Sequence, residues 1–506
     1  MPCELGRDAS PGRGHVLCEG MSHNELDPHH ARRWTVLGLL ALTQLMVVLD
    51  ATIVNIALPS AQTDLGFSDD SRQWVVTAYA LAFGSLLLLG GRLGDYFGRK
   101  WAFIIGLLGF AIASAIGGAS ESFGMLIAAR ALQGAFGALL APAGLALLST
   151  IFTDPQERAK AFGAFGAVAA GGAALGLLLG GILTELLSWR WCLYVNLLIA
   201  IPAAFGSLTL LHNRAHPDRP PLDLAGTITA TAGLFSLVFG FSNSATDSWT
   251  APLTIAALAA AVILLAANVV IESRVRFPLL PPRVIADRNR GGAFLAMGLS
   301  GIAMFAVFLF LTYYLQNTKG YTPIETGLAF LPLTIVIAIT GILVNIKLLA
   351  RFGPRPLMTL GMLLGAVAMF WVAQITPDSS YVGLILPALI VNALAMGLIF
   401  APGLVSATHD VLPTDAGVAS ATVNVMQQVG GAIGTALLSS IFASSVASYL
   451  SGKPDTPAIT DLANVHGYTV CFYVAGGIFL FGAVVVGLMM ESFKVEDPMA
   501  SMTAAV

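Results

Sequence analysis

Long apolar runs alternate with short polar segments along almost the whole chain. The runs are about 20 residues long, which is the length that an α-helix needs to cross the hydrocarbon core of a bilayer. We therefore predict an all-α polytopic membrane protein. The pattern predicts fourteen spans, at residues 34–59, 74–91, 101–119, 123–149, 159–184, 191–211, 224–243, 251–271, 291–316, 324–349, 356–375, 381–404, 417–449 and 467–490.

The composition supports this class of protein. Apolar residues make up 56% of the chain and charged residues only 10%, whereas soluble domains carry about 25% charged residues. So few charged side chains cannot cover the water-exposed surface of a 506-residue soluble protein. A water-soluble fold is therefore excluded.

The basic residues indicate the orientation in the membrane. With the N-terminus in the cytoplasm, the inner segments hold 20 Lys and Arg residues and the outer segments hold 4, namely Arg72, Arg190, Lys319 and Lys453. Cytoplasmic loops are enriched in Lys and Arg. The distribution predicts a multi-pass protein of the cytoplasmic (inner) membrane with both termini inside the cell.

The two ends of the chain are polar. Residues 1–33 lack the apolar core and small-residue cleavage site of a signal peptide, so we interpret them as a disordered cytoplasmic tail. Residues 491–506 form a second cytoplasmic tail in this interpretation. Of the four cysteines, two lie in the first tail and two lie in apolar spans, which does not indicate a disulfide framework.

The chain contains an internal repeat. Residues 91–100 read GRLGDYFGRK and residues 346–355 read IKLLARFGPR, so that a constant offset of 255 aligns Gly98 with Gly353. Each segment follows the second span of a six-span block. Two repeated halves around a midplane cavity are typical of secondary transporters. We predict an N-terminal six-helix bundle over 34–211, an inserted helix pair with its flanking loops over 212–290, and a C-terminal six-helix bundle over 291–490.

Several motifs resemble those of a known family. GRLGDYFGRK looks like the loop signature of the major facilitator superfamily. Four further segments are similar to the fourteen-span drug:proton antiporters of that superfamily: LDATIVNIALP in span 1, IAARALQGAFGALLAPAGLALLS in span 4, SWRWCLYVN in span 6 and AGVASATVNVMQQVGGAIGTALLS in span 13. The resemblance covers residues 34–490 and implies the major facilitator fold and multidrug efflux. The chain departs from the family where a glycine–proline pair reads Gly176-Leu177 and an Asn-x-Pro pattern ends in Leu198.

The loop signature also has a physical interpretation. Its glycines allow a tight turn and a close approach of helices, and its acid can pair with a cation or with a helix N-terminus. A contact made in only one transporter state would bias the conformational equilibrium, and the resemblance supports this gating role. The alternative is that the loop fixes topology through its charges alone. The residues concerned are Gly91, Arg92, Asp95, Gly98, Arg99 and Lys100.

Asp50 and Arg130 are the only acid and the only base well inside the predicted spans. Charges at this depth are costly and mark functional sites. At 1.5 Å per residue, Asp50 lies roughly 14 Å inward from Pro59, and Arg130 lies roughly 10 Å inward from Phe123. Because buried charges have partners, we expect both side chains to share one network in the outer half of the membrane.

Three uses of Asp50 are open at this point. Burial favours the neutral acid, whereas a nearby guanidinium favours the carboxylate, so a carboxyl group held between the two can load and release a proton. The leading hypothesis is that Asp50 carries the proton and that Arg130 sets its proton affinity. A permanent ion pair that clips two helices together is the main alternative. Direct binding of a cationic substrate is the third.

Other polar and small residues within the spans are candidates for packing or for the cavity. Gly172, Gly176 and Gly180 form a ridge of small residues that favours close helix packing. Polar side chains are costly in lipid, so they should point inward, some as contacts between helices and others toward a substrate. The cavity candidates are Gln44, Asn55, Gln133, Tyr313, Asn424 and Gln428.

The chain carries no nucleotide-binding loop, no zinc-protease motif and no nucleophile elbow. We therefore expect no enzyme, no cofactor and no metal, and no basic run suits nucleic acid. The expected partners are a small-molecule substrate, protons and the lipid bilayer, and we expect a monomer to be functional. The favoured function is proton-driven export of small hydrophobic or amphipathic compounds such as drugs or antibiotics. The alternatives are a solute or metabolite transporter, either a symporter or an exporter of a self-made antibiotic, and a receptor or lipid-handling protein.

Overall fold

The computed structural model describes residues 32–152, 155–211, 223–275, 278, 280–411, 416–454 and 456–493, and over these residues it contains helices and no strand. The η segments are single π-helical turns that extend an adjoining α-helix. The helices are α1 (Arg33–Leu65), α2 (Asp69–Phe97), α3 (Arg99–Gly118), α4 (Phe123–Ile151), α5 (Pro155–Leu186), α6 (Trp191–Leu210), α7 (Leu224–Thr246), α8 (Pro252–Glu272), α9 (Pro282–Ile285), α10 (Arg288–Tyr313), η1 (Tyr314–Thr318), α11 (Pro323–Leu343), η2 (Val344–Leu348), α12 (Leu349–Phe352), α13 (Pro354–Val372), η3 (Tyr381–Ile385), α14 (Leu386–Thr408), α15 (Ala416–Leu450) and α16 (Pro457–Met489).

Thirteen helices in the described part of the chain are long and apolar enough to cross a membrane. The remaining predicted span, 159–184, lies in α5, whose apolar part Gly171–Leu186 is shorter. The prediction of an all-α polytopic membrane protein is therefore confirmed.

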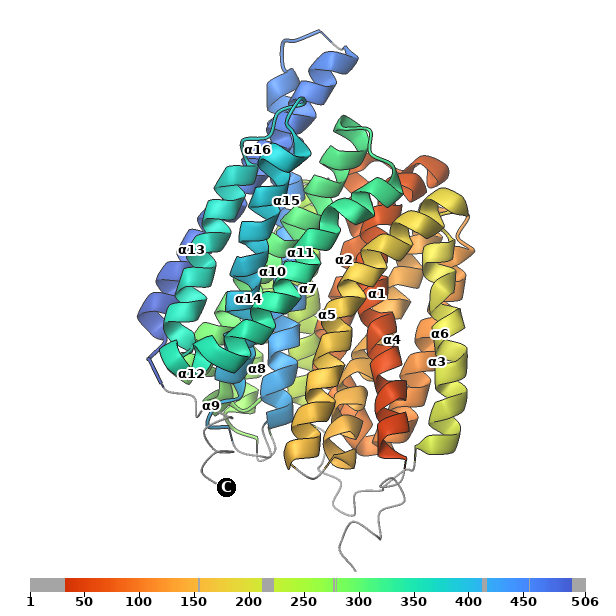
Figure 1. Cartoon of the computed structure of the whole chain (residues 1–506), viewed down its shortest axis with the longest axis vertical. Coiled ribbons are helices and arrows are strands. Elements are labelled where there is room, and N and C mark those ends of the chain that lie inside the picture. The colour runs from red at the N-terminus through yellow and green to blue at the C-terminus, as the bar shows by residue number, and fades with distance from the viewer. Residues whose placement is uncertain are drawn as a thin grey trace, which may run out of the picture.

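The long helices form two groups that lie side by side (Figure 1). In the first group, α4 packs between α2 and α3, and α1 packs against α5 and α6. In the second group, α13 packs against α14 and α16, and α10 packs against α15 and α16. We call these groups the N-terminal half (α1–α6) and the C-terminal half (α10–α16).

The pair α7 and α8 lies outside both groups. α7 contacts α2 of the N-terminal half and α15 of the C-terminal half, whereas α8 packs chiefly on α7. The two helices approach closely, because a Cβ atom added at Gly240 would lie 2.8 Å from side-chain carbons of Leu258. The domain boundaries given above stay a prediction.

The same backbone conformation occurs at both copies of the predicted internal repeat. α2 ends at Phe97 and α12 ends at Phe352, and the glycine that follows has a positive φ in both cases, 97° at Gly98 and 73° at Gly353. The prediction of a loop over residues 91–100 was wrong in its extent, because α2 continues to Phe97 and α3 begins at Arg99. Gly98 alone makes the turn, and Gly91 and Gly94 are helical.

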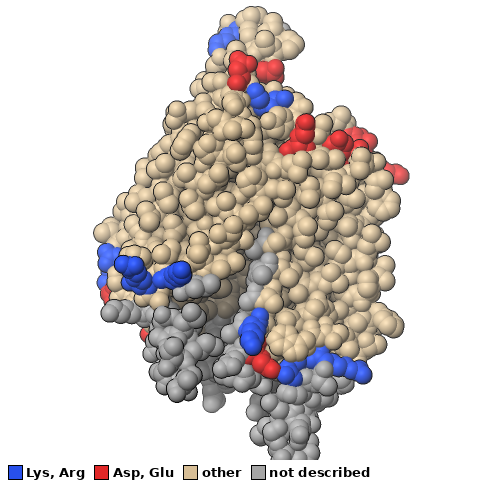
Figure 2. All heavy atoms as spheres, in the orientation of Figure 1, with Lys and Arg blue, Asp and Glu red and all other residues tan. Residues whose placement is uncertain are grey.

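The two ends of the molecule differ in charge. Figure 2 shows that most of the visible Lys and Arg side chains lie at the lower end and most of the visible Asp and Glu side chains at the upper end. α1 begins at the lower end (Figure 1). We call the lower end the basic end and the upper end the opposite end.

The two halves meet tightly toward the opposite end. A Cβ atom added at Gly181 of α5 would lie 2.5 Å from the carbonyl oxygen of Pro323, and one added at Gly327 of α11 would lie 2.6 Å from that of Leu177. At the basic end the surface is hollowed between the halves (Figure 2). The structure is therefore closed toward the opposite end and open toward the basic end.

The predicted glycine ridge of α5 lies against α1. A Cβ atom added at Gly176 would lie 2.0 Å from Oγ1 of Thr52 and 3.0 Å from the carbonyl oxygen of Leu49. Gly172 and Gly180 approach the same helix, at the side chain of Leu45 and the backbone of Ile53. A side chain at position 176 would press on the backbone of Leu49, which cannot move away as a flexible side chain can. The contact therefore requires glycine there.

We predict that Gly176→Ala lowers the free energy of unfolding by about 1–3 kcal/mol, the usual cost of overpacking. The measurement is thermal unfolding of the purified protein in detergent. Gly171→Ala on the same helix is the matched control, because a Cβ atom there meets nothing within 4 Å. Equal unfolding temperatures for the two variants would contradict the close contact.

Candidate functional site

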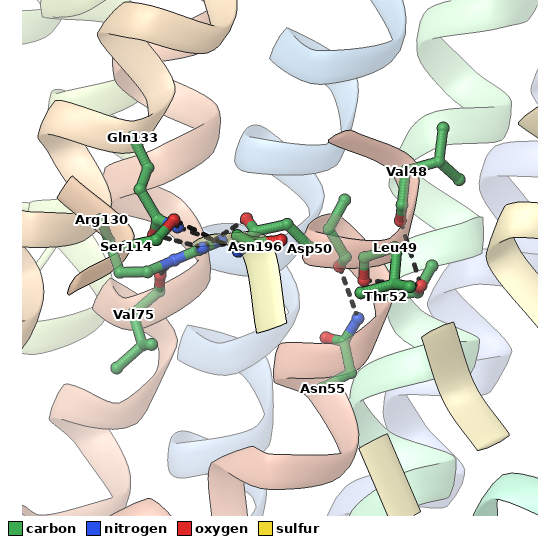
Figure 3. A network of polar contacts seen from close by, with 11 residues as sticks. Val48, Leu49, Asp50, Thr52, Asn55, Val75, Ser114, Arg130, Gln133 and Asn196 are labelled. Atoms are coloured by element: carbon green, nitrogen blue, oxygen red, sulfur yellow. Dashed lines mark hydrogen bonds and ion pairs between the residues drawn. The ribbon is translucent and has the colours of Figure 1, made fainter. Parts of the chain in front are cut away.

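Asp50 lies at the centre of a buried polar network inside the N-terminal half (Figure 3). Its side chain is 0% exposed, and that of Arg130 is 2% exposed. Nη1 of Arg130 donates to Oδ2 of Asp50 at 2.7 Å. Nε2 of Gln133 and Nδ2 of Asn196 donate to Oδ1 of Asp50, at 2.9 and 2.7 Å. All of these groups donate, and the carboxyl oxygens of Asp50 accept.

Arg130 is held from other sides as well. Its Nε donates to the carbonyl oxygen of Val75 at 3.2 Å, and its Nη1 also donates to Oε1 of Gln133 at 2.8 Å. The guanidinium carbon lies 4.5 Å from the ring centroid of Tyr79. Val75 and Tyr79 belong to α2, so Arg130 connects α4 to α1 and to α2.

Two members of the network were not among the residues singled out from the sequence. Oγ of Ser114 on α3 accepts from Gln133 at 2.7 Å and from Asn196 at 3.2 Å. Asn196 was noted only for its place in a family pattern. The sequence feature that could have identified Asn196 is an amide inside an apolar span, but many other amides in this chain share that feature. Oδ1 of Asn196 is buried and has no hydrogen-bond partner among the described residues.

The energetics of the pair depend on its burial. Removing two charges from water costs several kcal/mol per ion, and only close contact with full hydrogen bonding compensates for this cost. Loss of one partner leaves an uncompensated buried charge and costs about 3–5 kcal/mol. Any change in the charge of Asp50 must therefore disturb the contacts of Arg130.

The carboxylate points away from the C-terminal half. Gln44, Ala51, Asn55 and Gln62 lie on one stripe of α1, at spacings of 4 and 7 residues. Gln62 accepts from the hydroxyl of Tyr313 on α10 at 3.5 Å, so this stripe faces the C-terminal half. Nδ2 of Asn55 donates to the carbonyl oxygen of Ala51 at 3.2 Å, apart from the network around Asp50 (Figure 3). The side chain of Asp50 is therefore not exposed to the space between the halves in this conformation.

The other predicted cavity residues fall into two groups. Asn424 and Gln428 are half-buried on α15, and Cβ of Gln428 lies 3.5 Å from a Cβ atom added at Gly84 of α2. These residues therefore lie on the side of α15 that faces the N-terminal half. Gln133 belongs to the Asp50 network instead.

Tyr313 lies in a seal between the halves. The guanidinium carbon of Arg72 on α2 lies 3.6 Å from the ring centroid of Tyr313 and 5.5 Å from that of Phe442 on α15. Nε2 of Gln316 donates to the carbonyl oxygen of Ile56 at 3.3 Å nearby. We call Arg72, Tyr313, Gln316 and Phe442 the seal. Arg72 lies in the first turn of α2 and is only 5% exposed, so it is buried within the protein, and its place in an outer segment stays a prediction.

The loop-signature residues lie at the basic end. Arg92 donates to the carbonyl oxygen of Pro278 at 2.7 Å, beyond α8. Arg99 donates to the carbonyl oxygen of Ala146 at the end of α4, at 3.2 Å, and Lys100 donates to that of Leu208 at the end of α6, at 3.0 Å. Cations near helix C-termini are favourable. The side chain of Asp95 lies outside the described residues, so its gating role stays a prediction.

Residues 40–435 match the sequence profile of the Major Facilitator Superfamily. The chain belongs to the major facilitator superfamily. It is thus a membrane transporter by family and by fold.

Curated relatives match over most of their length. The puromycin resistance protein pur8 of Streptomyces alboniger is 50% identical over 463 residues, which cover 91% of this chain and 92% of that protein. The cephamycin export protein CmcT of Amycolatopsis lactamdurans is 40% identical, covering 86% and 88%. The tetracenomycin C resistance and export protein of Streptomyces glaucescens is 34% identical, covering 86% and 80%.

Solved structures share the major facilitator fold. One is a bacterial homologue of the human lysosomal transporter Spinster, in an inward-facing and unoccupied conformation, with a TM-score of 0.64 at 14% identity, covering 90% of this chain and 96% of that chain. Another is the nucleoside transporter NupG, with a TM-score of 0.62 at 14% identity, covering 90% and 100%. At this identity the likeness concerns the fold alone.

The cation–π contact of the seal leads to a prediction. Tyr313→Leu removes the ring beneath Arg72 and should raise the population that is open at the opposite end by about 2- to 30-fold, as a contact of about 0.5–2 kcal/mol implies. The measurement is the rate at which a Gln316→Cys thiol reacts with an impermeant maleimide added at that end.

Tyr313→Phe is the control for this experiment. It keeps the ring and removes the hydroxyl group that donates to Gln62 at 3.5 Å. An equal labelling rate in the Leu and Phe variants would show that the ring does not hold the halves together.

Proposed function

We propose that this major facilitator protein exports small hydrophobic or amphipathic compounds, antibiotics among them, in exchange for protons. The observation that carries the proposal is the fully buried Asp50–Arg130 pair inside the N-terminal half. The names of three relatives, which concern puromycin, cephamycin and tetracenomycin C, support antibiotics as the substrate class. Two of these names include the word export, which favours outward transport over uptake.

In this proposal the basic end faces the cytoplasm. The excess of Lys and Arg at that end supports the orientation, because cytoplasmic segments are enriched in these residues. The hollow at the basic end then receives substrate from the cytoplasm or from the inner leaflet. The protein acts in the cytoplasmic membrane with both termini inside the cell.

Protonation of Asp50 is the step that couples the proton to the transporter. A proton from water forms an O–H bond on the carboxylate, which becomes a donor at a place where three groups already donate to it. Asn196 can relieve this conflict, because its buried Oδ1 has no partner in the described part of the chain and can accept after the amide rotates. Arg130 keeps its charge and loses its counter-ion.

The loss of the counter-ion acts on the seal through α2. Arg72 of the seal, Val75 and Tyr79 lie within two turns of this helix, and the last two contact Arg130. A shift of Arg130 toward other partners therefore moves the helix that holds the seal. The proton biases the equilibrium between the two open states because its binding energy differs between them.

The two facing stripes carry amides rather than acids in the described residues. Gln44 and Asn55 lie on α1, and Asn424 and Gln428 lie on α15. Amide groups form hydrogen bonds without a fixed charge. This lining suits neutral or at most monocationic amphipathic compounds. Contact between these four residues and a substrate belongs to the proposal.

We predict that Asp50→Asn reduces proton-driven efflux by about tenfold or more, since coupling energies between sites are typically about 1–3 kcal/mol. The amide keeps the shape of the side chain but cannot exchange a proton. The measurement is substrate-dependent proton release from membrane vesicles, with puromycin, a cephamycin and tetracenomycin C as the test compounds.

Glu121→Gln is the matched control, because this acid is exposed between α3 and α4 and lies outside the network. Proton-coupled efflux that survives Asp50→Asn unchanged would refute the carrier role. Proton flow in the same direction as the substrate would instead indicate a symporter.

A further inference from the structure

A cavity lies beside the Asp50–Arg130 pair, on the side of the opposite end. It has a volume of about 10 Å³ and is enclosed by α1, α2, α4, α6 and the turn that precedes α6. Arg130 forms one wall, and Trp189 forms the wall on the side of the opposite end. The cavity is inside the N-terminal half, so it is separate from the space between the halves.

The α1 wall of the cavity connects two acids. Val54, Ala57 and Ala61 line the cavity, and they lie on the same face of α1 as Asp50 and Asp64. The two acids are about 21 Å apart along the helix at 1.5 Å per residue. The cavity therefore occupies the interval between the buried acid and an acid at the surface of the opposite end.

A polar cap closes the cavity toward that surface. Nε1 of Trp189 donates to Oδ2 of Asp64 at 2.9 Å, and Nη1 of Arg190 binds the same oxygen. Nη2 of Arg190 donates to the carbonyl oxygen of Ser120 at 2.9 Å. The side chains of Asp64 and Arg190 are 47% and 31% exposed, so the cap is in contact with water.

The cavity walls other than Arg130 are mainly apolar, with Leu58, Leu126 and Leu193 among them. A volume of about 10–15 Å³ and at least two polar partners are needed to hold one water molecule. The cavity is at the lower limit of size and offers one polar side chain. In the present conformation, which is closed at the opposite end, the cavity therefore cannot pass a proton between Asp64 and Asp50.

The side chain of Asp50 is fully buried in this conformation. Among the described residues, the titratable and charged groups around it are Arg130 on α4, Tyr79 on α2 and Cys192 on α6. The cavity therefore lies between this buried acid and the water at the cap.

We propose that this cavity is the closed form of a proton route through the interior of the N-terminal half, which runs from Asp64 and Trp189 to Asp50. The proposal rests on the proposed function. When the opposite end opens, the walls separate and water enters past the Trp189 cap. A hydronium ion then transfers its proton to a carboxylate oxygen of Asp50, and water remains in the route. Substrate and proton reach the protein through different spaces, so they do not compete for one site.

Two substitutions change the hydration of the cavity in opposite directions. Ala61→Val fills space at the cavity wall and should slow proton uptake from the opposite end by about three- to tenfold. Cys192→Ser places a hydroxyl group at the wall and should speed uptake by a similar factor. A folding defect would lower uptake in both variants, so opposite changes distinguish the route from damage.

Matched controls exist for both changes. Ala41→Val alters a buried alanine of α1 that does not line the cavity, and Cys471→Ser alters a buried cysteine of the C-terminal half. The measurement is dye-detected proton uptake after an acid jump, in vesicles sorted by the orientation of the protein. The proton uptake of the Asp50→Asn variant is subtracted from that of each other variant. An acid jump at the basic end should give the same uptake in all variants.

The outcomes separate the route from the proposed function. Opposite changes in the two cavity variants, confined to the opposite end, support the route. Asp50-dependent uptake that neither variant changes overturns the route and leaves the carrier role of Asp50 intact. Uptake that is the same in Asp50→Asn and in the unaltered protein overturns the carrier role itself.

Discussion

The ion pair between Asp50 and Arg130 has almost no contact with solvent, and the N-terminal half is built around it. Two charges in a low-dielectric interior persist only when close contact and further hydrogen bonds compensate for their loss of water. Gln133, Asn196 and Ser114 supply these groups from α3, α4 and α6. With Val75 and Tyr79 of α2, the pair thereby connects five of the six helices, and its charge state becomes a property of the whole bundle.

The same helices reach the contact between the halves. α2 holds Arg130 through Val75 and Tyr79 and holds the C-terminal half through Arg72. α1 carries Asp50 on its inward face and Gln62 on its other face. A change of charge within the bundle therefore has a short mechanical path to the seal. This arrangement places the buried pair two helical turns from the residues that join the two halves.

Much of this organisation follows from local features of the sequence. The apolar runs predict the helices, because a backbone in lipid must satisfy its hydrogen bonds within one segment. The depths of Asp50 and Arg130 predict a shared network, because rise per residue converts position into depth. The turn at Gly98 was correctly predicted as part of the repeat, but the helix before it continues to Phe97. A polar segment next to the membrane has no apolar signal that marks where a helix ends.

The sequence by itself determined the class of protein, the helices, the repeat and the two intramembrane charges, because these depend on composition and on spacing along one segment. Tertiary structure decided which groups meet. Arg72 was expected in an outer polar segment and is buried against Tyr313, and Asn196 joins the acid from a helix far along the chain. The rotation of each helix about its axis decides such contacts. That rotation depends on the packing of all neighbours together, which no single segment encodes.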